Sequence, residues 1–247
     1  MSINLSVLQS VSPNTYASAS PFPHVVLKGL FDRELLTRAA AEYPSLDAMG
    51  RQYESKREVK SAESRWDHFG PAVREIISEL NSGTFVEELQ RLSDIEGLVV
   101  DAGLYGGGQH QIGPGGFLGV HADFNVHPTL GLYRRLNALV YLNDDWDESF
   151  GGHLELWGDG GPEVTVAPEL GTVVIFTTTD EAMHGHPHPL TCPEGRSRRS
   201  IATYYYTMKP HDALDIPRST LFRGEEGGRF KKSYQFAAMA IKSLIRA

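Results

Sequence analysis

The sequence has one cysteine and no long apolar run, and these two absences limit the class of protein. Cys192 is the only cysteine among 247 residues. An intramolecular disulfide is therefore excluded, and a reducing, cytoplasmic location is expected. No stretch reaches the roughly 18 apolar residues that a membrane-spanning helix requires. Residues 1–20 lack a basic start followed by a continuous apolar segment, so no signal peptide is expected.

The sequence also lacks a surplus of basic residues. The formal net charge is −8 at pH 7, whereas nucleic acids and anionic membranes attract basic surfaces. No nucleic-acid partner and no membrane partner is therefore expected.

The pattern of apolar residues predicts a single domain with three parts. Its length of 247 residues is sufficient for a sizeable core. The expected parts are a helical lead-in and support over residues 1–96, a β-rich core over 97–208 and a tail with a closing helix over 209–247.

Three helices are expected in the lead-in. Asp32 is a candidate cap for a helix over residues 33–43. Pro71 occupies a favoured first-turn position for a second helix, and apolar residues at helical spacing predict a third over 84–92. The segments between them carry weaker signals: residues 1–20 are expected to be loosely ordered, and residues 46–70 to form an irregular connector or a mobile loop over the site.

From Leu98 onward, short apolar runs alternate with glycine and proline. Six or more such runs without a helical period indicate an antiparallel β architecture. Because a double-sheet jelly roll protects the edges of many short strands, the expected fold is mostly β: a double-stranded β-helix, or cupin-like jelly roll, with the N-terminal helices packed on one sheet.

His121 and Asp123 form a candidate metal-binding pair. Side chains alternate between the two faces of a strand, so these residues point the same way while Ala122 points away. A third ligand is available much later in the chain from His184, His186 or His188. Two imidazoles and one carboxylate on one side of a metal leave the opposite positions open, which is the arrangement of non-haem Fe(II) oxygenases.

Six segments in a fixed order resemble the Fe(II)/2-oxoglutarate-dependent oxygenases, specifically the prolyl 4-hydroxylase-like branch. The resemblance covers roughly residues 97–208. Its segments are HADF (121–124), RLNALVYLN (135–143), GGHLELW (151–157), PELGTVVIF (168–176), HGHPHPL (184–190) and RRSIATYYY (198–206).

This resemblance implies Fe(II) held by His121, Asp123 and His184, because His184 has the His-Gly context of the family's third ligand. It also implies 2-oxoglutarate and O2 as co-substrates, with ascorbate as a further candidate cofactor. Asp123 keeps the carboxylate that halogenating relatives lack, so hydroxylation is the expected outcome.

The far carboxylate of 2-oxoglutarate requires a buried cation, and an arginine offers two parallel donors. The family places a basic residue before the last apolar strand, which implies Arg199, with Thr203 on the same strand face. The chain between His184 and this strand is longer than the family's usual spacing, so Arg198 remains an alternative. The resemblance also implies co-substrate contacts from Tyr141 and Gln111.

The expected function is an Fe(II)- and 2-oxoglutarate-dependent dioxygenase that hydroxylates an unactivated C–H bond and releases succinate and CO2. The substrate is expected to be an amino acid, a peptidyl proline or another small molecule, because the fold alone does not fix the substrate. The alternative is a jelly-roll metal-binding protein, a ligand binder or sensor without oxygenase turnover.

Overall fold

Antiparallel strands form most of the regular secondary structure that the structure describes, as the sequence predicts. The computed structural model describes residues 2–210 and 217–224. The predicted closing helix at the C-terminus lies outside these residues. The strands are β1 (His24–Leu27), β2 (Arg51–Glu54), β3 (Glu58–Glu63), β4 (Val99–Val100), β5 (Gly108–Ile112), β6 (Phe117–Ala122), β7 (Tyr133–Tyr141), β8 (Leu154–Gly158), β9 (Gly161–Val166), β10 (Val173–Thr177), β11 (Met183–His186), β12 (Arg198–Thr207) and β13 (Leu221–Phe222).

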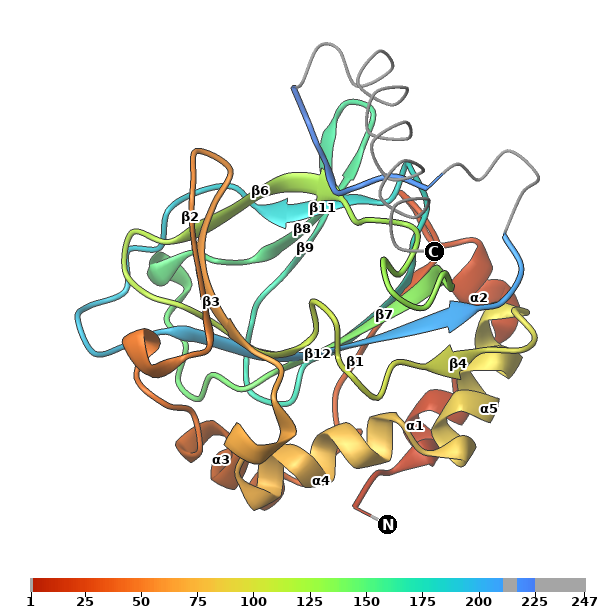
Figure 1. Cartoon of the computed structure of the whole chain (residues 1–247), viewed down its shortest axis with the longest axis horizontal. Coiled ribbons are helices and arrows are strands. Elements are labelled where there is room, and N and C mark those ends of the chain that lie inside the picture. Colours follow the sequence, from red (N-terminus) through yellow and green to blue (C-terminus); the bar gives the residue numbers. More distant parts are fainter. Residues whose placement is uncertain (1, 211–216, 225–247) are drawn as a thin grey trace, which may run out of the picture.

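The strands follow one path of hydrogen-bonded neighbours, β1-β10-β7-β12-β5-β3-β6-β11-β8-β9. Strands β13, β2 and β4 pair with β6, β3 and β12 outside this path. In Figure 1 the path curls over itself, so that β6, β11, β8 and β9 form one layer and β1, β7 and β12 the other. The predicted jelly roll is confirmed.

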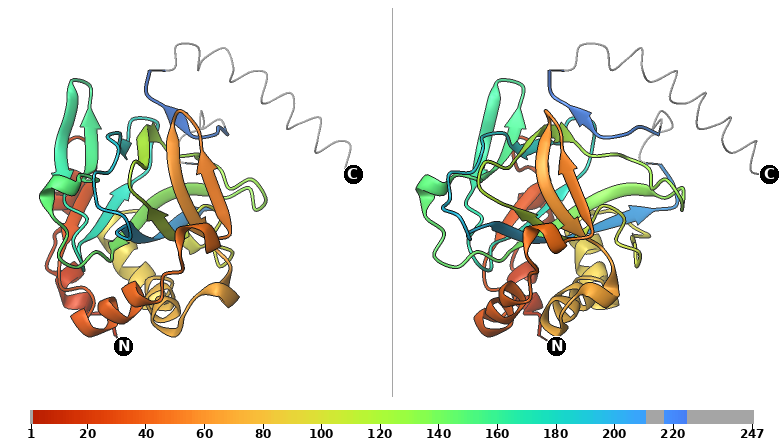
Figure 2. Two further views of the ribbon diagram at one scale, coloured as in Figure 1. Left: turned by 90° about the vertical axis from the view of Figure 1, so that its left-hand side faces the viewer. Right: turned by 60° about the vertical axis from the view of Figure 1, so that its left-hand side comes forward.

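Helices cover the outer face of the β7 and β12 layer (Figures 1 and 2). Apolar residues of α4 and α5 and of these strands share one buried cluster, in which Ile76 and Leu89 pack with Val140 and Ile201. The hydroxyl of Tyr205 donates to the Leu80 carbonyl at 2.8 Å, which fixes α4 against β12. The helices are α1 (Leu5–Gln9), α2 (Pro13–Ala17), α3 (Arg33–Ala41), α4 (Pro71–Leu80) and α5 (Gly83–Ser93), with short 3-10 turns at Leu46–Ala48, Trp66–His68 and Glu148–Phe150.

The three predicted helices are present as α3, α4 and α5. Asp32 occupies the N-cap position of α3, but its side chain makes no capping hydrogen bond. Pro71 is the first residue of α4. None of the helices among the described residues combines the length and apolarity needed to cross a bilayer.

Two expectations about the lead-in are wrong. Residues 1–20 contain α1 and α2, whose side chains Leu8 and Tyr16 are buried. Helices of five residues gain their stability from tertiary packing rather than from local sequence, so a helical period of apolar residues does not predict them. Residues 46–70 contain the β2–β3 hairpin, because β3 pairs with β5 and β6, which lie far along the chain.

Candidate functional site

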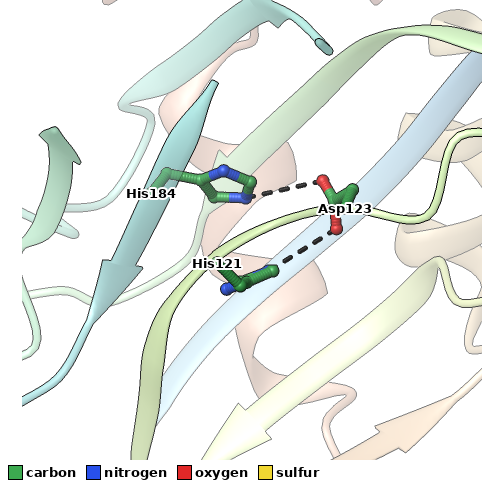
Figure 3. A group of neighbouring side chains, drawn as sticks. All are labelled: His121, Asp123 and His184. Atoms are coloured by element: carbon green, nitrogen blue, oxygen red, sulfur yellow. Dashed lines mark ion pairs between the residues drawn. The ribbon is translucent and has the colours of Figure 1, made fainter. Parts of the chain in front are cut away.

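His121, Asp123 and His184 lie together inside the barrel, where β6 and β11 run side by side (Figure 3). His121 and His184 are direct partners in the register of these two strands, and Asp123 follows the end of β6. One potential ligand atom from each residue lies within 4.8 Å of the others. Asp123 Oδ1 is 3.5 Å from His121 Nε2, and Asp123 Oδ2 is 3.5 Å from His184 Nε2.

Backbone carbonyls determine which nitrogen of each histidine is free. Nδ1 of His121 lies 2.8 Å from the Gly119 carbonyl, and Nδ1 of His184 lies 2.9 Å from the Ala182 carbonyl. Each Nδ1 therefore carries the proton and donates it, which leaves the Nε2 lone pairs directed at the common centre. Burial first, and then the neighbouring His121 ring, lowers the pKa of His184 to about 4, so its imidazole is neutral at pH 7.

Asp123 is held by two residues of β7. Asn137 Nδ2 donates to Asp123 Oδ2 at 2.7 Å, and Arg134 Nη2 forms an ion pair with the same oxygen at 3.1 Å. Burial by itself raises the pKa of Asp123, but Arg134 and the two histidines together hold it well below its ordinary value. Asp123 is therefore an anion, as a metal ligand must be.

The donor set fits a divalent transition metal. Two neutral imidazole nitrogens and one carboxylate oxygen are the ligands that leave open coordination positions on Fe(II). His186 does not belong to this group of ligand atoms, and His188 is exposed. Among the three candidates for the second imidazole, only His184 therefore lies beside His121 and Asp123.

Two adjoining cavities meet at the triad. The outer cavity has a volume of about 180 Å³ and includes His121 and Asp123 in its wall. Its remaining wall is mainly aromatic and basic: Arg51, Tyr53, Lys60, Tyr105, Phe124, Arg134, Tyr204 and Phe222, with Glu58 beside Lys60.

The inner cavity has a volume of about 70 Å³ and shares His121 and Asp123 in its wall with the outer cavity. All three members of the triad line it, together with four apolar side chains from β5, β6, β7 and β8. Many hydrogen-bond donors line it, namely Lys60, His110, Arg134, Asn137, Tyr141, His186, Arg198, Ser200 and Tyr204, beside the apolar Ile112, Leu118, Leu139 and Leu154.

Arg198, and not Arg199, points into the inner cavity. Arg198 is 5 % exposed; its Nε donates to the Gly152 carbonyl at 2.6 Å and its Nη2 to the Tyr141 hydroxyl at 3.1 Å. Arg199 lies on the opposite face of β12, where its Nη1 donates to the Ala40 carbonyl at 2.9 Å. The expectation that Arg199 points into the barrel is therefore corrected, and the alternative, Arg198, occupies that position.

Of the other three residues predicted to contact the co-substrate, one lines the inner cavity and two do not. Tyr141 lines the inner cavity. Thr203 faces the helices with Arg199, and its hydroxyl lies 3.0 Å from the hydroxyl of Tyr205. Gln111 also points away from both cavities and donates to the Ser197 hydroxyl at 2.8 Å.

His110 and Lys60 are among the cavity residues that were not predicted from the sequence as site residues. His110 precedes Gln111 on β5 and points inward, so the signal lay one residue away. Lys60 belongs to the segment that was expected to be irregular. His186 was a candidate for the third metal ligand, but it does not belong to the group of ligand atoms and lines the inner cavity, where it is 3 % exposed. Burial first, and then the charges of Arg198 and Lys60, lowers the pKa of His186 well below its ordinary range, so its ring is neutral.

The central part of the chain matches a known family. The profile of the 2OG-Fe(II) oxygenase superfamily matches residues 107–206, a range that contains the triad, Tyr141 and Arg198. No curated protein matches the sequence.

Solved prolyl hydroxylases share the fold. A prolyl-4-hydroxylase from Pseudomonas putida superposes with a TM-score of 0.56 at 20 % identity, covering 82 % of this chain and 100 % of that chain. A prolyl hydroxylase from Trichoplax adhaerens, solved with a hypoxia-inducible-factor peptide fragment, gives 0.56 at 16 %, covering 81 % and 87 %. A prolyl 4-hydroxylase from Phytophthora capsici gives 0.56 at 19 %, covering 96 % and 76 %.

Proposed function

We propose that the chain is an Fe(II)- and 2-oxoglutarate-dependent dioxygenase of the 2OG-Fe(II) oxygenase superfamily, whose profile matches residues 107–206, and that it hydroxylates an unactivated C–H bond of a small-molecule or peptidyl substrate. The observation that carries the proposal is the shared cavity. The three-residue metal site and the buried guanidinium of Arg198 line the same cavity.

The metal ligands in this proposal are Nε2 of His121, Nε2 of His184 and a carboxylate oxygen of Asp123. The carbonyls of Gly119 and Ala182 keep both imidazoles in the required tautomer. Fe(II) in such a site supplies the coupling of O2 reduction to the decarboxylation of 2-oxoglutarate, so that one oxygen atom enters the substrate as hydroxyl and succinate and CO2 are released.

The inner cavity is the proposed 2-oxoglutarate site. Arg198 would pair with the carboxylate farther from the metal, and the Tyr141 hydroxyl, which already accepts from Arg198, can donate its own proton to the same carboxylate. The apolar side chains of Ile112, Leu139 and Leu154 exclude water from the carbon chain between the two ends. Exclusion of water lowers the local dielectric constant, which would strengthen the ion pair between Arg198 and the carboxylate of 2-oxoglutarate.

The outer cavity is the proposed entrance for the substrate. It reaches His121 and Asp123 from the side of the β2–β3 hairpin, whose Tyr53 and Lys60 line it. Its aromatic and basic wall accommodates a free amino acid, a proline-containing peptide or another small polar molecule. The Trichoplax relative was solved with a peptide, which supports peptidyl proline as one member of the substrate panel.

The test is a coupled turnover assay under Fe(II), 2-oxoglutarate, O2 and ascorbate. Free amino acids, proline-containing peptides and small metabolites are each added, and succinate and hydroxylated product are quantified. We expect one class to raise succinate release and to yield an equal amount of product, and we expect His121→Ala to abolish both. If the metal-loaded wild-type protein binds no 2-oxoglutarate and releases no succinate, the chain is instead a metal-binding jelly roll without turnover.

A further inference from the structure

His186 is buried in the inner cavity two residues beyond the metal-binding His184. Both belong to β11 and both line the inner cavity, although the register with β6 shifts between them, from His184 opposite His121 to His186 opposite Leu118. His186 lines the inner cavity and is absent from the wall of the outer cavity. A molecule that contacts its ring must therefore enter the inner cavity.

Neither ring nitrogen of His186 has a hydrogen-bond partner among the residues that the structure describes. The other inward-pointing histidines differ: His110, His121 and His184 each have a ring nitrogen within 3.0 Å of a backbone carbonyl. A buried polar group without a partner costs about 1 to 3 kcal/mol, so such groups are rare in folded proteins. Here the unpartnered ring faces a cavity, where a ligand can satisfy it.

The surroundings of His186 identify the chemistry of that ligand. Arg198 and Lys60 line the same cavity as His186. An imidazole ring has an N–H donor. A cavity lined by a guanidinium, an ammonium group and an N–H donor selects a carboxylate.

We propose that His186 donates an N–H hydrogen bond to the carboxylate of 2-oxoglutarate that pairs with Arg198. This assignment rests on the proposed function and adds a specificity-determining residue to it. His184 and His186 then have different roles in one cavity: His184 binds the metal, and His186 recognises the far carboxylate of the co-substrate. Keto acids that lack a second carboxylate forfeit this contact.

The test compares two keto acids on the Mn(II)-loaded protein, which binds them without turnover. 2-Oxoglutarate carries the distal carboxylate, whereas 2-oxobutyrate has the same keto-acid head and lacks it. We expect His186→Leu to weaken 2-oxoglutarate binding about ten- to hundredfold and to change 2-oxobutyrate binding less than about threefold. His186→Gln, which retains an N–H donor, should recover part of the loss.

Two controls separate recognition from folding. Mn(II) affinity, measured for each variant, reports on the triad and should stay at the wild-type value. His188→Leu, at the exposed histidine two positions further on, should change neither keto acid. If His186→Leu fails to bind Mn(II), His186→Met fills the same space with a flexible side chain and serves for the same comparison.

The outcomes distinguish this inference from the function on which it rests. Equal weakening of both keto acids, or no change in either, overturns the role of His186 and leaves the oxygenase intact. A wild-type protein that binds Mn(II) but neither keto acid overturns the proposed co-substrate site itself.

Discussion

Arg198 and Tyr141 form a buried pair across two adjacent strands of the barrel. The guanidinium donates to the tyrosine hydroxyl at 3.1 Å, and its central carbon lies 4.8 Å from the centre of the ring. Arg198 forms no ion pair with a carboxylate among the described residues. A buried guanidinium without an anionic partner is costly, which supports the proposed pairing of Arg198 with a carboxylate of 2-oxoglutarate.

Replacement of Arg198 by methionine should weaken 2-oxoglutarate binding at least about thirtyfold, because removing one member of a buried charge pair leaves the other uncompensated. Arg199→Met is the matched control on the next residue. It removes the same charge from the opposite face of β12 and should change the affinity less than about threefold. Titration of the Mn(II)-loaded variants with 2-oxoglutarate measures both affinities. If Arg199→Met weakened binding and Arg198→Met did not, Arg199 would be the residue that binds the carboxylate.

Tyr141→Phe removes only the hydroxyl that accepts from Arg198. The affinity for 2-oxoglutarate should fall about two- to tenfold, the usual effect of one hydrogen bond. Tyr205→Phe is a suitable control, because that hydroxyl is also buried but donates to the Leu80 carbonyl outside the cavity. Tyr205→Phe should lower the free energy of unfolding and leave 2-oxoglutarate binding unchanged, whereas equal affinities for both variants would exclude Tyr141 from the site.

The error over the two arginines has a physical cause. Alternation along a strand correctly predicts that Arg198 and Arg199 lie on opposite faces, but it does not say which face is inside. The face with Ile201 and Tyr205 packs on α4, and the other face lines the cavity, so nearly every residue of β12 is buried. Hydropathy distinguishes a buried face from a solvated one, and β12 has no solvated face.

Part of the triad was predictable from a local signal. His121 and Asp123 are two residues apart in the sequence, whereas spacing left His184, His186 and His188 open, and only the resemblance to the oxygenase family, through its His-Gly context, favoured His184. The β2–β3 hairpin and the burial of His186 depend instead on strands that are distant in the sequence. β3 carries charged residues and is held through backbone pairing with β5 and β6, so it lacks the apolar alternation that predicts a strand.

Asn137 should contribute to metal binding although it is not a ligand. Its amide holds Oδ2 of Asp123 at 2.7 Å and thereby orients the carboxylate. Asn137→Ala should weaken binding of Co(II) or Mn(II) about ten- to hundredfold, as is usual when a group that orients a metal ligand is lost. Spectroscopic metal titration of the protein measures this effect.

Asn143→Ala is the control for Asn137. Asn143 is also a buried asparagine, and its Nδ2 donates to the Pro168 carbonyl at 2.6 Å, away from the triad. The control should lose stability without losing metal affinity. Equal metal affinities of wild type and Asn137→Ala would show that Arg134 alone suffices to orient Asp123.

Glu63 stabilises the base of the β2–β3 hairpin through an acid-sensitive cluster. Its carboxylate accepts from the backbone N–H of Gly50 at 3.0 Å and from Nε and Nη2 of Arg65 at 2.9 and 2.8 Å, and its side chain is 3 % exposed. The hydrogen bonds from Arg65 lower the pKa of Glu63 to about 2, from 4.5. Glu63→Gln should therefore lower the free energy of unfolding at pH 7 by about 1 to 3 kcal/mol, measured by urea denaturation.

The pH dependence of that difference tests the cause. A carboxyl whose pKa is lower in the folded state contributes stability above its unfolded value and loses it as the pH falls. The difference in unfolding free energy between wild type and Glu63→Gln should accordingly shrink as the pH falls from 4.5 to about 2. Glu75→Gln, whose ion pair with Arg38 spans 4.0 Å between partly exposed side chains, should show almost no gap at any pH. A gap for Glu63→Gln that stays constant down to pH 2 would mean that packing, and not the carboxylate charge, holds the hairpin.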